Sequence, residues 1–429
     1  MIELHNHLYG SLSVEMVYEM GKNNPNPRWN IFLELHEKLF GEKLFPETFF
    51  EIFDSPKKLE SLYYFTKAGS FEEFQSKFNL IIALSKFDPD EIQEVSYQVA
   101  CKHFSEGILY LEYRLMYSPF ASQEDYYSKT LAACKGLQRA EKNYKGYNSK
   151  LIISLHRDQN FEQAYLWLKS LMQENEIVKN YLVGIDFCYI EEGFPPKDKF
   201  NFFQKVLEDN QKAPEYALAI LYHVAESFND KTPDSAVRWV IESSEYGAHR
   251  LGHCIALGIE PSIYLGQVRK ESIDERRDHL SFLISRYEEI SCFGKIPELK
   301  KLQKELIQLK NKSGCIEIIY QTQEVETLYA LQEYGIKRLK ENGTIVESCP
   351  TSNLLIGKLD KLEFLPVKRF FESGLKLTIS TDDPGILNTN LQKEYEICKQ
   401  LGLSNIDLET IQTNSLTYKS EILANRYSK

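Results

Sequence analysis

The sequence lacks the features that mark several classes of protein. It has no excess of basic charge, since 51 lysines and arginines stand against 62 aspartates and glutamates, for a formal net charge of −11. Phosphate binding needs a basic surface, so this balance argues against a nucleic-acid scaffold and against binding to anionic membranes. No uncharged apolar run is long enough to span a bilayer, and the first residues predict a strand rather than a signal peptide. The expected partners are therefore small molecules.

Cysteine is sparse and scattered. The eight cysteines stand singly, with no CxxC pair and no spacing typical of a disulfide framework. This usage predicts a reducing compartment, and we expect a cytoplasmic protein.

Eight runs rich in β-branched and apolar residues predict strands, and helical patterns lie between most of them. The runs are 2–8, 108–115, 150–156, 181–187, 218–224, 246–253, 344–349 and 375–381. Such alternation predicts an α/β protein with a parallel sheet, here a (β/α)8 TIM barrel. With 43% hydrophobic and 13% aromatic residues, the chain can bury a large core, and we expect one domain over 1–429.

Two of the connections between predicted strands are longer than a simple barrel requires. Residues 14–84 predict extra helices after strand 1, broken by the Asn- and Pro-rich stretch 23–27. The connection between strands 6 and 7 is far longer than a helix and two short loops. We expect a charged helical insertion there, at about 262–335, with a hairpin of two amphipathic helices over 271–312. It would cap the site, contact another subunit, or pack outside the barrel.

Residues that bind metals stand at the ends of several predicted strands. His5 and His7 are two apart on one strand and share a face, so both can bind one ion. His223 and Asp382 would complete a set of protein ligands typical of zinc, with one position left for a water of lowered pKa. Each residue alone is weak evidence for a metal site, since a single His is more often a core residue whose ring nitrogens have hydrogen-bond partners. The shared location at strand ends, where barrels place active sites, favours a metal centre.

Three more residues fit the same centre. Glu226 lies three residues after His223, near enough to deliver a proton without binding the metal. His253 and Asp383 would orient the attacking water and the substrate. The alternatives are ordinary: a carboxylate at a helix start for Glu226, a strand-end hydrogen bond for His253, and a turn at Asp383 and the proline after it.

Five segments together resemble the adenosine deaminase family of the metal-dependent amidohydrolase superfamily. They are ELHNHLYGSL at 3–12, HVAE at 223–226, RLGH at 250–253, ESCPTSN at 347–353 and STDDP at 380–384. Their order matches the family as well. Weaker likeness lies at 110–119 and 184–196, so the resemblance covers nearly the whole chain.

The resemblance implies hydrolytic loss of ammonia from the 6-position of an aminopurine, with one Zn²⁺ per chain. By this likeness His5, His7, His223 and Asp382 bind zinc. Glu226 protonates the ring nitrogen, His253 assists the attacking hydroxide, and Asp383 bonds the imidazole side of the purine, with His7 also near the substrate. Since Glu226 must be protonated, we expect burial to raise its pKa.

Two positions depart from the family pattern, and both concern the substrate. Adenosine-specific members carry an acidic residue where this chain has Tyr9, and a glycine where it has Tyr189. A carboxylate would repel a 5′-phosphate, whereas a tyrosine hydroxyl can donate to one, with Arg114 or Arg157 as the positive partner. Alternatively, both arginines are structural, and the tyrosines narrow the pocket.

We therefore expect a zinc-dependent deaminase of adenosine or deoxyadenosine. The alternatives are a deaminase of a purine 5′-mononucleotide (AMP, dAMP or N6-methyl AMP) or of another aminopurine, and a barrel that binds a purine or a partner protein without turnover. A homo-oligomer formed through the inserted helices is a further expectation.

Overall fold

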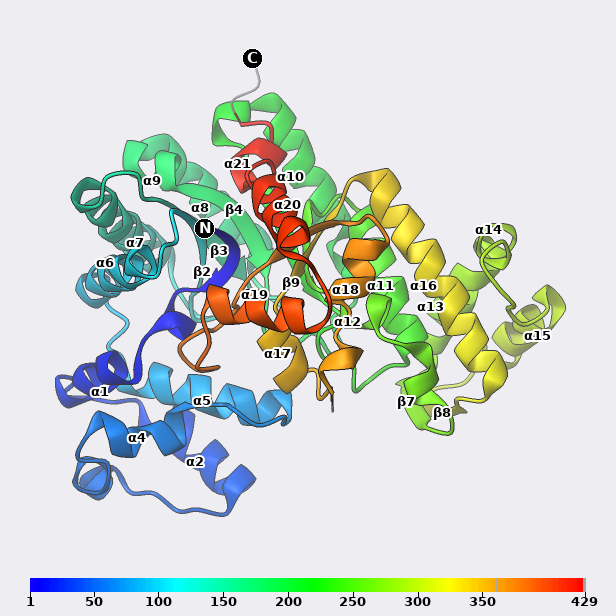
Figure 1. The fold of residues 1–429 in the computed structure, drawn as a ribbon, viewed down its shortest axis with the longest axis horizontal. Helices are drawn as coiled ribbons and strands as arrows, with labels where there is room; N and C mark the ends of the chain where they lie inside the picture. Colours follow the sequence, from blue (N-terminus) through cyan, green and yellow to red (C-terminus); the bar gives the residue numbers. More distant parts are fainter. Residues whose placement is uncertain (360, 427–429) are drawn as a thin grey trace.

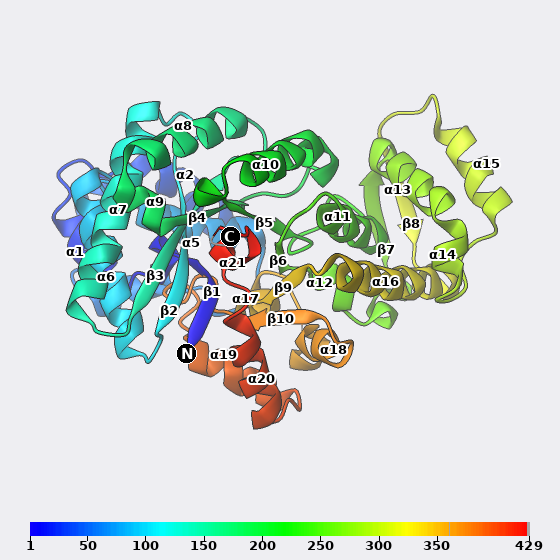
Figure 2. The same ribbon diagram turned by 90° about the horizontal axis from the view of Figure 1, so that it is seen from above.

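Eight parallel strands form the centre of the molecule (Figure 2). The computed structural model describes residues 1–359 and 361–426. The strands are β1 (Ile2–His7), β2 (Tyr110–Met116), β3 (Asn148–Leu155), β4 (Leu182–Phe187), β5 (Ala219–Val224), β6 (Arg250–His253), β9 (Ile345–Ser348) and β10 (Lys376–Ile379), in this spatial order. A parallel bridge between Asn6 and Asp382 joins the first strand to the last. The eight predicted strands and the (β/α)8 barrel are confirmed.

Helices surround this sheet, as parallel strands require for their crossovers. They are α6 (Pro89–Ser105), α7 (Gln123–Asn143), α8 (Phe161–Glu174), α9 (Glu176–Tyr181), α10 (Phe200–Lys212), α11 (Pro233–Glu245), α12 (Ile255–Gly258), α16 (Thr322–Asn342), α17 (Pro350–Leu355), α18 (Val367–Glu372), α19 (Leu391–Gln400), α20 (Asn405–Ser415) and α21 (Ser420–Leu423). Among the residues described, no helix combines the length and apolarity needed to cross a membrane.

The extra helices after β1 are present and cover one end of the barrel. They are α1 (Val14–Lys22), α2 (Trp29–Phe40), α3 (Phe49–Ile52), α4 (Pro56–Tyr63) and α5 (Phe71–Leu84), grouped at the lower left of Figure 1. The predicted break at 23–27 separates α1 from α2. Tyr63 donates to the carbonyl of Leu12 at 2.5 Å, and the amide of Phe65 donates to Ile386 at 2.8 Å. These helices therefore pack on the loops that follow β1 and β10.

The insertion between β6 and β9 lies at the opposite side of the barrel from α1–α5 in both views (Figures 1 and 2). It contains α13 (Ile273–Ser285), α14 (Tyr287–Ser291) and α15 (Leu299–Leu309), and α13 packs on α15 as a hairpin with Leu302 and Leu309 buried. At its base lies an antiparallel ribbon of β7 (Val268–Ser272) and β8 (Cys315–Ile319). This ribbon was not predicted from the sequence, because β7 is mostly charged and polar.

The insertion packs against α11 and α16 on the outside of the barrel. Its base reaches the loop after β5, where Arg269 donates to the carbonyl of Phe228 at 2.7 Å and Glu271 accepts from Thr232. From α13, Asp278 pairs with Lys197 in the loop after β4 at 2.5 Å. These contacts match packing beside the barrel.

A network of buried charges fills the barrel interior. Arg250 donates to the carboxylates of Glu112 and Glu347, each at 2.6 Å, and Glu347 also accepts from Arg114 at 2.5 Å. All four side chains are fully buried. Because burying a charge is costly unless it is paired, each member depends on the others.

Removing the shared arginine should therefore destabilise the fold. We expect Arg250→Met to lower the free energy of unfolding by about 3–5 kcal/mol, since two buried carboxylates lose a partner. Urea denaturation measures the change. The matched control is Arg139→Met, which breaks the exposed pair with Glu94, and its unfolding midpoint should stay near the wild-type value. An Arg250→Met midpoint equal to that of the control would contradict the assigned role.

Candidate active site

The predicted metal ligands meet at the carboxyl ends of β1, β5 and β10. His5 and His7 lie in β1, His223 is in β5, and Asp382 follows β10. Parallel strands deliver these residues because all their carboxyl ends face one side of the barrel. Asp382 adopts a φ of 65°, a left-handed conformation that is costly for a non-glycine residue and often occurs at functional sites. This turn allows its carboxylate to lie beside the imidazoles.

The four side chains converge on one point. Oδ1 of Asp382 lies 3.2 Å from Nε2 of both His5 and His7, and Nε2 of His7 lies 3.3 Å from Nε2 of His223. One ligand atom from each of the four residues lies within 4.8 Å of the others. The imidazoles of His5 and His7 hold the pKa of Asp382 well below its usual range, although burial alone would raise it. The carboxylate is therefore ionised.

Two buried carboxylates behind this point orient the imidazoles. Glu347 pairs with Nδ1 of His5 at 2.9 Å, and Asp186 pairs with Nδ1 of His223 at 3.1 Å. Because a carboxylate binds the protonated ring nitrogen, each Nε2 presents a lone pair to the centre. Burial lowers the pKa of His223 well below its usual value, so this ring stays neutral. Nε2 of His5 is buried without a hydrogen-bond partner. This donor set fits a bound metal ion.

Neither carboxylate was assigned a role from the sequence. Both lie in segments of the family resemblance, at 347–353 and 184–186, and that is the signal by which they could have been found. Both have pKa values well below their usual range, although burial would raise them. His223 and then Arg114, 3.6 Å away, lower the pKa of Asp186, and Arg114 and Arg250 lower the pKa of Glu347.

A second group shares Asp382. Nε2 of His253 lies 3.5 Å from Oε1 of Glu226 and 4.0 Å from Oδ2 of Asp382. Nδ1 of His253 donates to the amide oxygen of Asn353 at 2.8 Å, a partner the sequence analysis did not single out. Burial raises the pKa of Glu226, as predicted. Burial opposes protonation of His253, yet the carboxylates of Glu226 and Asp382 raise its pKa. These groups can hold and transfer protons next to the ligand point.

Asp383 presents an unsatisfied carboxyl oxygen. Its Oδ1 is buried and has no hydrogen-bond partner, and burial together with Asp382 and Glu226 raises its pKa well above the usual value. The carboxyl lies against Gly10, where an added Cβ would stand only 1.7 Å from Oδ1. Glycine at position 10 thus makes room for Asp383.

The two tyrosines differ in their surroundings. Tyr9 is 3% exposed, and its hydroxyl donates to Oε1 of Glu91 at 3.3 Å. Tyr189 is 48% exposed, and its ring contacts Phe71 of α5. Its φ of 72° is in the left-handed region that glycine adopts without strain. The backbone at 189 therefore retains a conformation suited to glycine while it carries a ring.

Both candidate arginines are structural. Arg114 is paired with Glu347 and Asp186 within the barrel. Arg157 donates to the carbonyls of Phe187 and His223 at 3.0 and 2.7 Å, and its guanidinium lies over the ring of Tyr222. Of the two readings that the sequence left open, the structural one matches these contacts.

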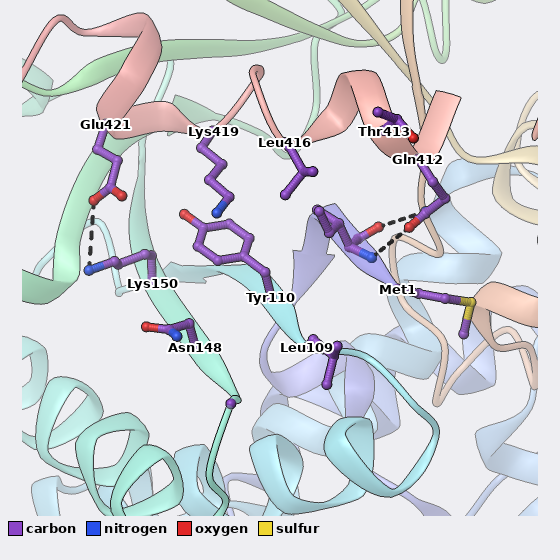
Figure 3. A pocket seen from close by; sticks show the side chains of 12 residues that line it. Met1, Leu109, Tyr110, Asn148, Lys150, Gln412, Thr413, Leu416, Lys419 and Glu421 are labelled. Atoms are coloured by element: carbon purple, nitrogen blue, oxygen red, sulfur yellow. Dashed lines mark hydrogen bonds and ion pairs between the residues drawn. The ribbon is translucent and has the colours of Figure 1, made fainter. Parts of the chain in front are cut away.

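A separate cavity of about 550 Å³ lies at the other end of the barrel (Figure 3). Its lining includes Tyr110, Lys150 and Lys419, and Lys419 lies over the ring of Tyr110. Within residues 1–359 and 361–426, the groups able to hold a metal lie at the carboxyl ends of the strands and not in this cavity. The strand-end site is therefore the candidate active site.

Comparisons with known proteins agree with this assignment. A family model described as adenosine deaminase matches residues 328–424. An adenosine deaminase from Shewanella denitrificans is 22% identical over 97% of this chain and 92% of the relative. An adenine deaminase from Rhizobium leguminosarum is 34% identical over 82 residues, which are 19% of this chain and 26% of the relative. The apo N6-methyl-AMP deaminase from Arabidopsis thaliana shares the fold, with a TM-score of 0.59 and 18% identity over 99% of this chain and 94% of that one.

A (β/α)8 barrel with imidazoles and carboxylates gathered at its strand ends is the arrangement that a metal-dependent amidohydrolase requires. The chain resembles the adenosine deaminase family, through the family model over residues 328–424 and through adenosine deaminases that match over nearly its whole length, and these likenesses support a hydrolytic deaminase. The resemblance noted from the sequence is confirmed.

The contact between Gly10 and Asp383 yields a prediction. In Gly10→Ala the new methyl group displaces the Asp383 carboxyl, and we expect deamination to lose about 100-fold in kcat/KM, as for a group misplaced by about 1 Å. The matched control is Gly294→Ala in the insertion, where the added Cβ meets Ala330 at 3.1 Å, and its kcat/KM should equal that of the wild type. Equal activity of Gly10→Ala and the control would refute the role of this contact.

Proposed function

We propose that the chain is a zinc-dependent deaminase that releases ammonia from C6 of a 6-aminopurine nucleoside, adenosine or deoxyadenosine. The observation that carries the proposal is the convergence of three imidazole Nε2 atoms and one Asp382 oxygen, with Glu226 and His253 directly beside them. A site that only bound a purine would have no use for a raised-pKa acid next to a metal-ligand set.

His5, His7, His223 and Asp382 would hold the ion. Three nitrogens and one carboxylate oxygen suit zinc, because borderline-soft divalent ions favour imidazole. When bound, zinc would supply a hydroxide nucleophile at neutral pH by lowering the pKa of water at the site. A second set, Glu226, His253 and Asp382, also has its ligand atoms within 4.8 Å of one another. It offers one nitrogen only, so we assign it to proton transfer instead.

The remaining residues act on the purine and on protons. Glu226, whose raised pKa keeps a proton available, would donate to the ring nitrogen beside C6, so that addition of hydroxide builds no carbanion-like charge. His253 would bind the attacking water through Nε2, since Asn353 occupies its Nδ1. Asp383, protonated because of its raised pKa, would donate from its carboxyl group to the imidazole side of the base.

The surroundings of Tyr9 favour a nucleoside over a 5′-mononucleotide. Its hydroxyl is engaged by the carboxylate of Glu91, and a carboxylate at this end would repel a phosphate. Arg114 and Arg157 are both occupied by protein partners. The fold likeness to an N6-methyl-AMP deaminase keeps a mononucleotide as the second candidate. In either case Tyr9 would lie at the sugar end and Tyr189 beside the base.

The test measures release of the C6 amine by the zinc-loaded protein from a panel of adenine, adenosine, deoxyadenosine, AMP, dAMP and the N6-methyl analogues. The amine is ammonia for the unmethylated substrates and methylamine for the N6-methyl analogues. We expect a free nucleoside to give the highest kcat/KM. Glu226→Gln, which keeps the shape but removes the proton donor, should retain zinc and lose about 10²–10⁴-fold in kcat.

Three results would count against parts of the proposal. Preference for a monophosphate would replace the nucleoside by the second candidate and leave the chemistry intact. Release of neither ammonia nor methylamine from any substrate, with zinc bound, would refute the assignment to 6-aminopurines. Near-normal turnover by Glu226→Gln would remove that residue from proton transfer.

A further inference from the structure

The barrel is closed between β1 and the segment after β10 by one backbone bridge and by side chains, rather than by a regular ladder. Other neighbouring strands share two or more register pairs, whereas β1 and β10 share the single bridge between Asn6 and Asp382, just beyond the end of β10. Two backbone bonds flank it: the amide of His7 donates to Asp382 at 2.8 Å, and the amide of Asp382 donates to His5 at 3.1 Å. The seam therefore falls at three of the four proposed metal ligands.

Buried side chains of β1 hold the residue before Asp382. Oε1 of Glu3 accepts from the amide of Thr381 at 2.8 Å and also from its hydroxyl. Nδ2 of Asn6 donates to Oγ1 of Thr381 at 3.1 Å, and Oδ1 of Asn6 accepts from Ser11 at 2.6 Å. Both Glu3 and Asn6 are 1% exposed or less. The amide group of Asn6 is thus bonded on both sides within the seam.

The contacts of Asn6 give its position in the strand its effect. Asn6 lies between His5 and His7, but its amide group binds Thr381 and Ser11. It thereby reaches the segment after β10, one residue before Asp382, whose left-handed backbone is sterically unfavourable and must be held by its surroundings. The same short segment of β1 thereby provides two proposed ligands, His5 and His7, and holds the backbone next to a third, Asp382.

We propose that Asn6, with Glu3 and Thr381, positions Asp382 for metal binding, so that the residue between the two β1 histidines sets the affinity of the site. This inference rests on the metal site of the proposed function. Loss of a residue that orients a metal ligand typically weakens metal binding by about 10–100-fold. Asn6 is a positioning residue because it touches neither the ligand point nor the substrate.

The experiment measures zinc affinity by competition with a chromophoric chelator, together with the thermal midpoint of the zinc-free protein. Two variants remove the hydrogen bond between Asn6 and Thr381. They are Asn6→Ala and the near-isosteric Thr381→Val, which removes Oγ1 but keeps the backbone bond to Glu3. The matched control is Asn210→Ala. Asn210 is a buried asparagine that binds the backbone of Leu218 through both amide atoms, at the start of β5 and away from the ligands.

We expect Asn6→Ala and Thr381→Val to bind zinc about 10–100-fold more weakly than the wild type. The double variant should lose less than the product of the two single effects, because both remove the same hydrogen bond. Asn210→Ala should lower the thermal midpoint but keep the wild-type zinc affinity.

Unchanged zinc affinity in Thr381→Val overturns the inference, even if Asn6→Ala fails to fold. Equal losses of affinity in Asn210→Ala and the seam variants would also overturn it, since they would reflect general destabilisation. A wild-type protein that binds no zinc refutes the metal site of the proposed function itself, and the inference with it.

Discussion

The carboxylate of Glu347 is the group on which the rest of the structure depends. It accepts from Arg250 and Arg114 within the barrel and pairs with Nδ1 of His5 at the ligand point. Two guanidinium groups keep it ionised in a place where burial would otherwise protonate it. The charges that stabilise the barrel interior therefore also fix the tautomer of His5, so stability and chemistry share one buried network.

Much of this arrangement could be predicted from the sequence, for identifiable reasons. Runs such as 218–224 are mainly apolar because barrel strands are buried on both faces, and several carry a site residue at or next to their end, as His223 and His253 do. His5, His7, His223 and Asp382 are of the types and spacing that metals need. The resemblance to the family rests also on the order of the five segments along the chain, which is the same as in the family.

What could not be predicted depends on contacts between distant segments. A buried carboxylate such as Asp186 looks like a surface one in the sequence, and its pairing with His223 exists only after β4 and β5 lie side by side. The ribbon of β7 and β8 was missed because strand β7 lacks an apolar alternation. Arg114 lies at a strand end like a ligand-binding residue, yet its partners on β4 and β9 make it structural. One of the two readings of Tyr9 left its hydroxyl free to bind a phosphate, but this hydroxyl donates to Glu91.

In the proposed function, three imidazoles and Asp382 hold one zinc ion, and Glu226 and His253 stay free for proton transfer. The most direct measurement is the crystal structure of the zinc-loaded protein with anomalous scattering at the zinc edge. We expect a single zinc at about 2.0–2.2 Å from Nε2 of His5, His7 and His223 and from an oxygen of Asp382. Zinc bound by Glu226, His253 and Asp382 instead, or located away from the strand ends, would contradict the proposed function.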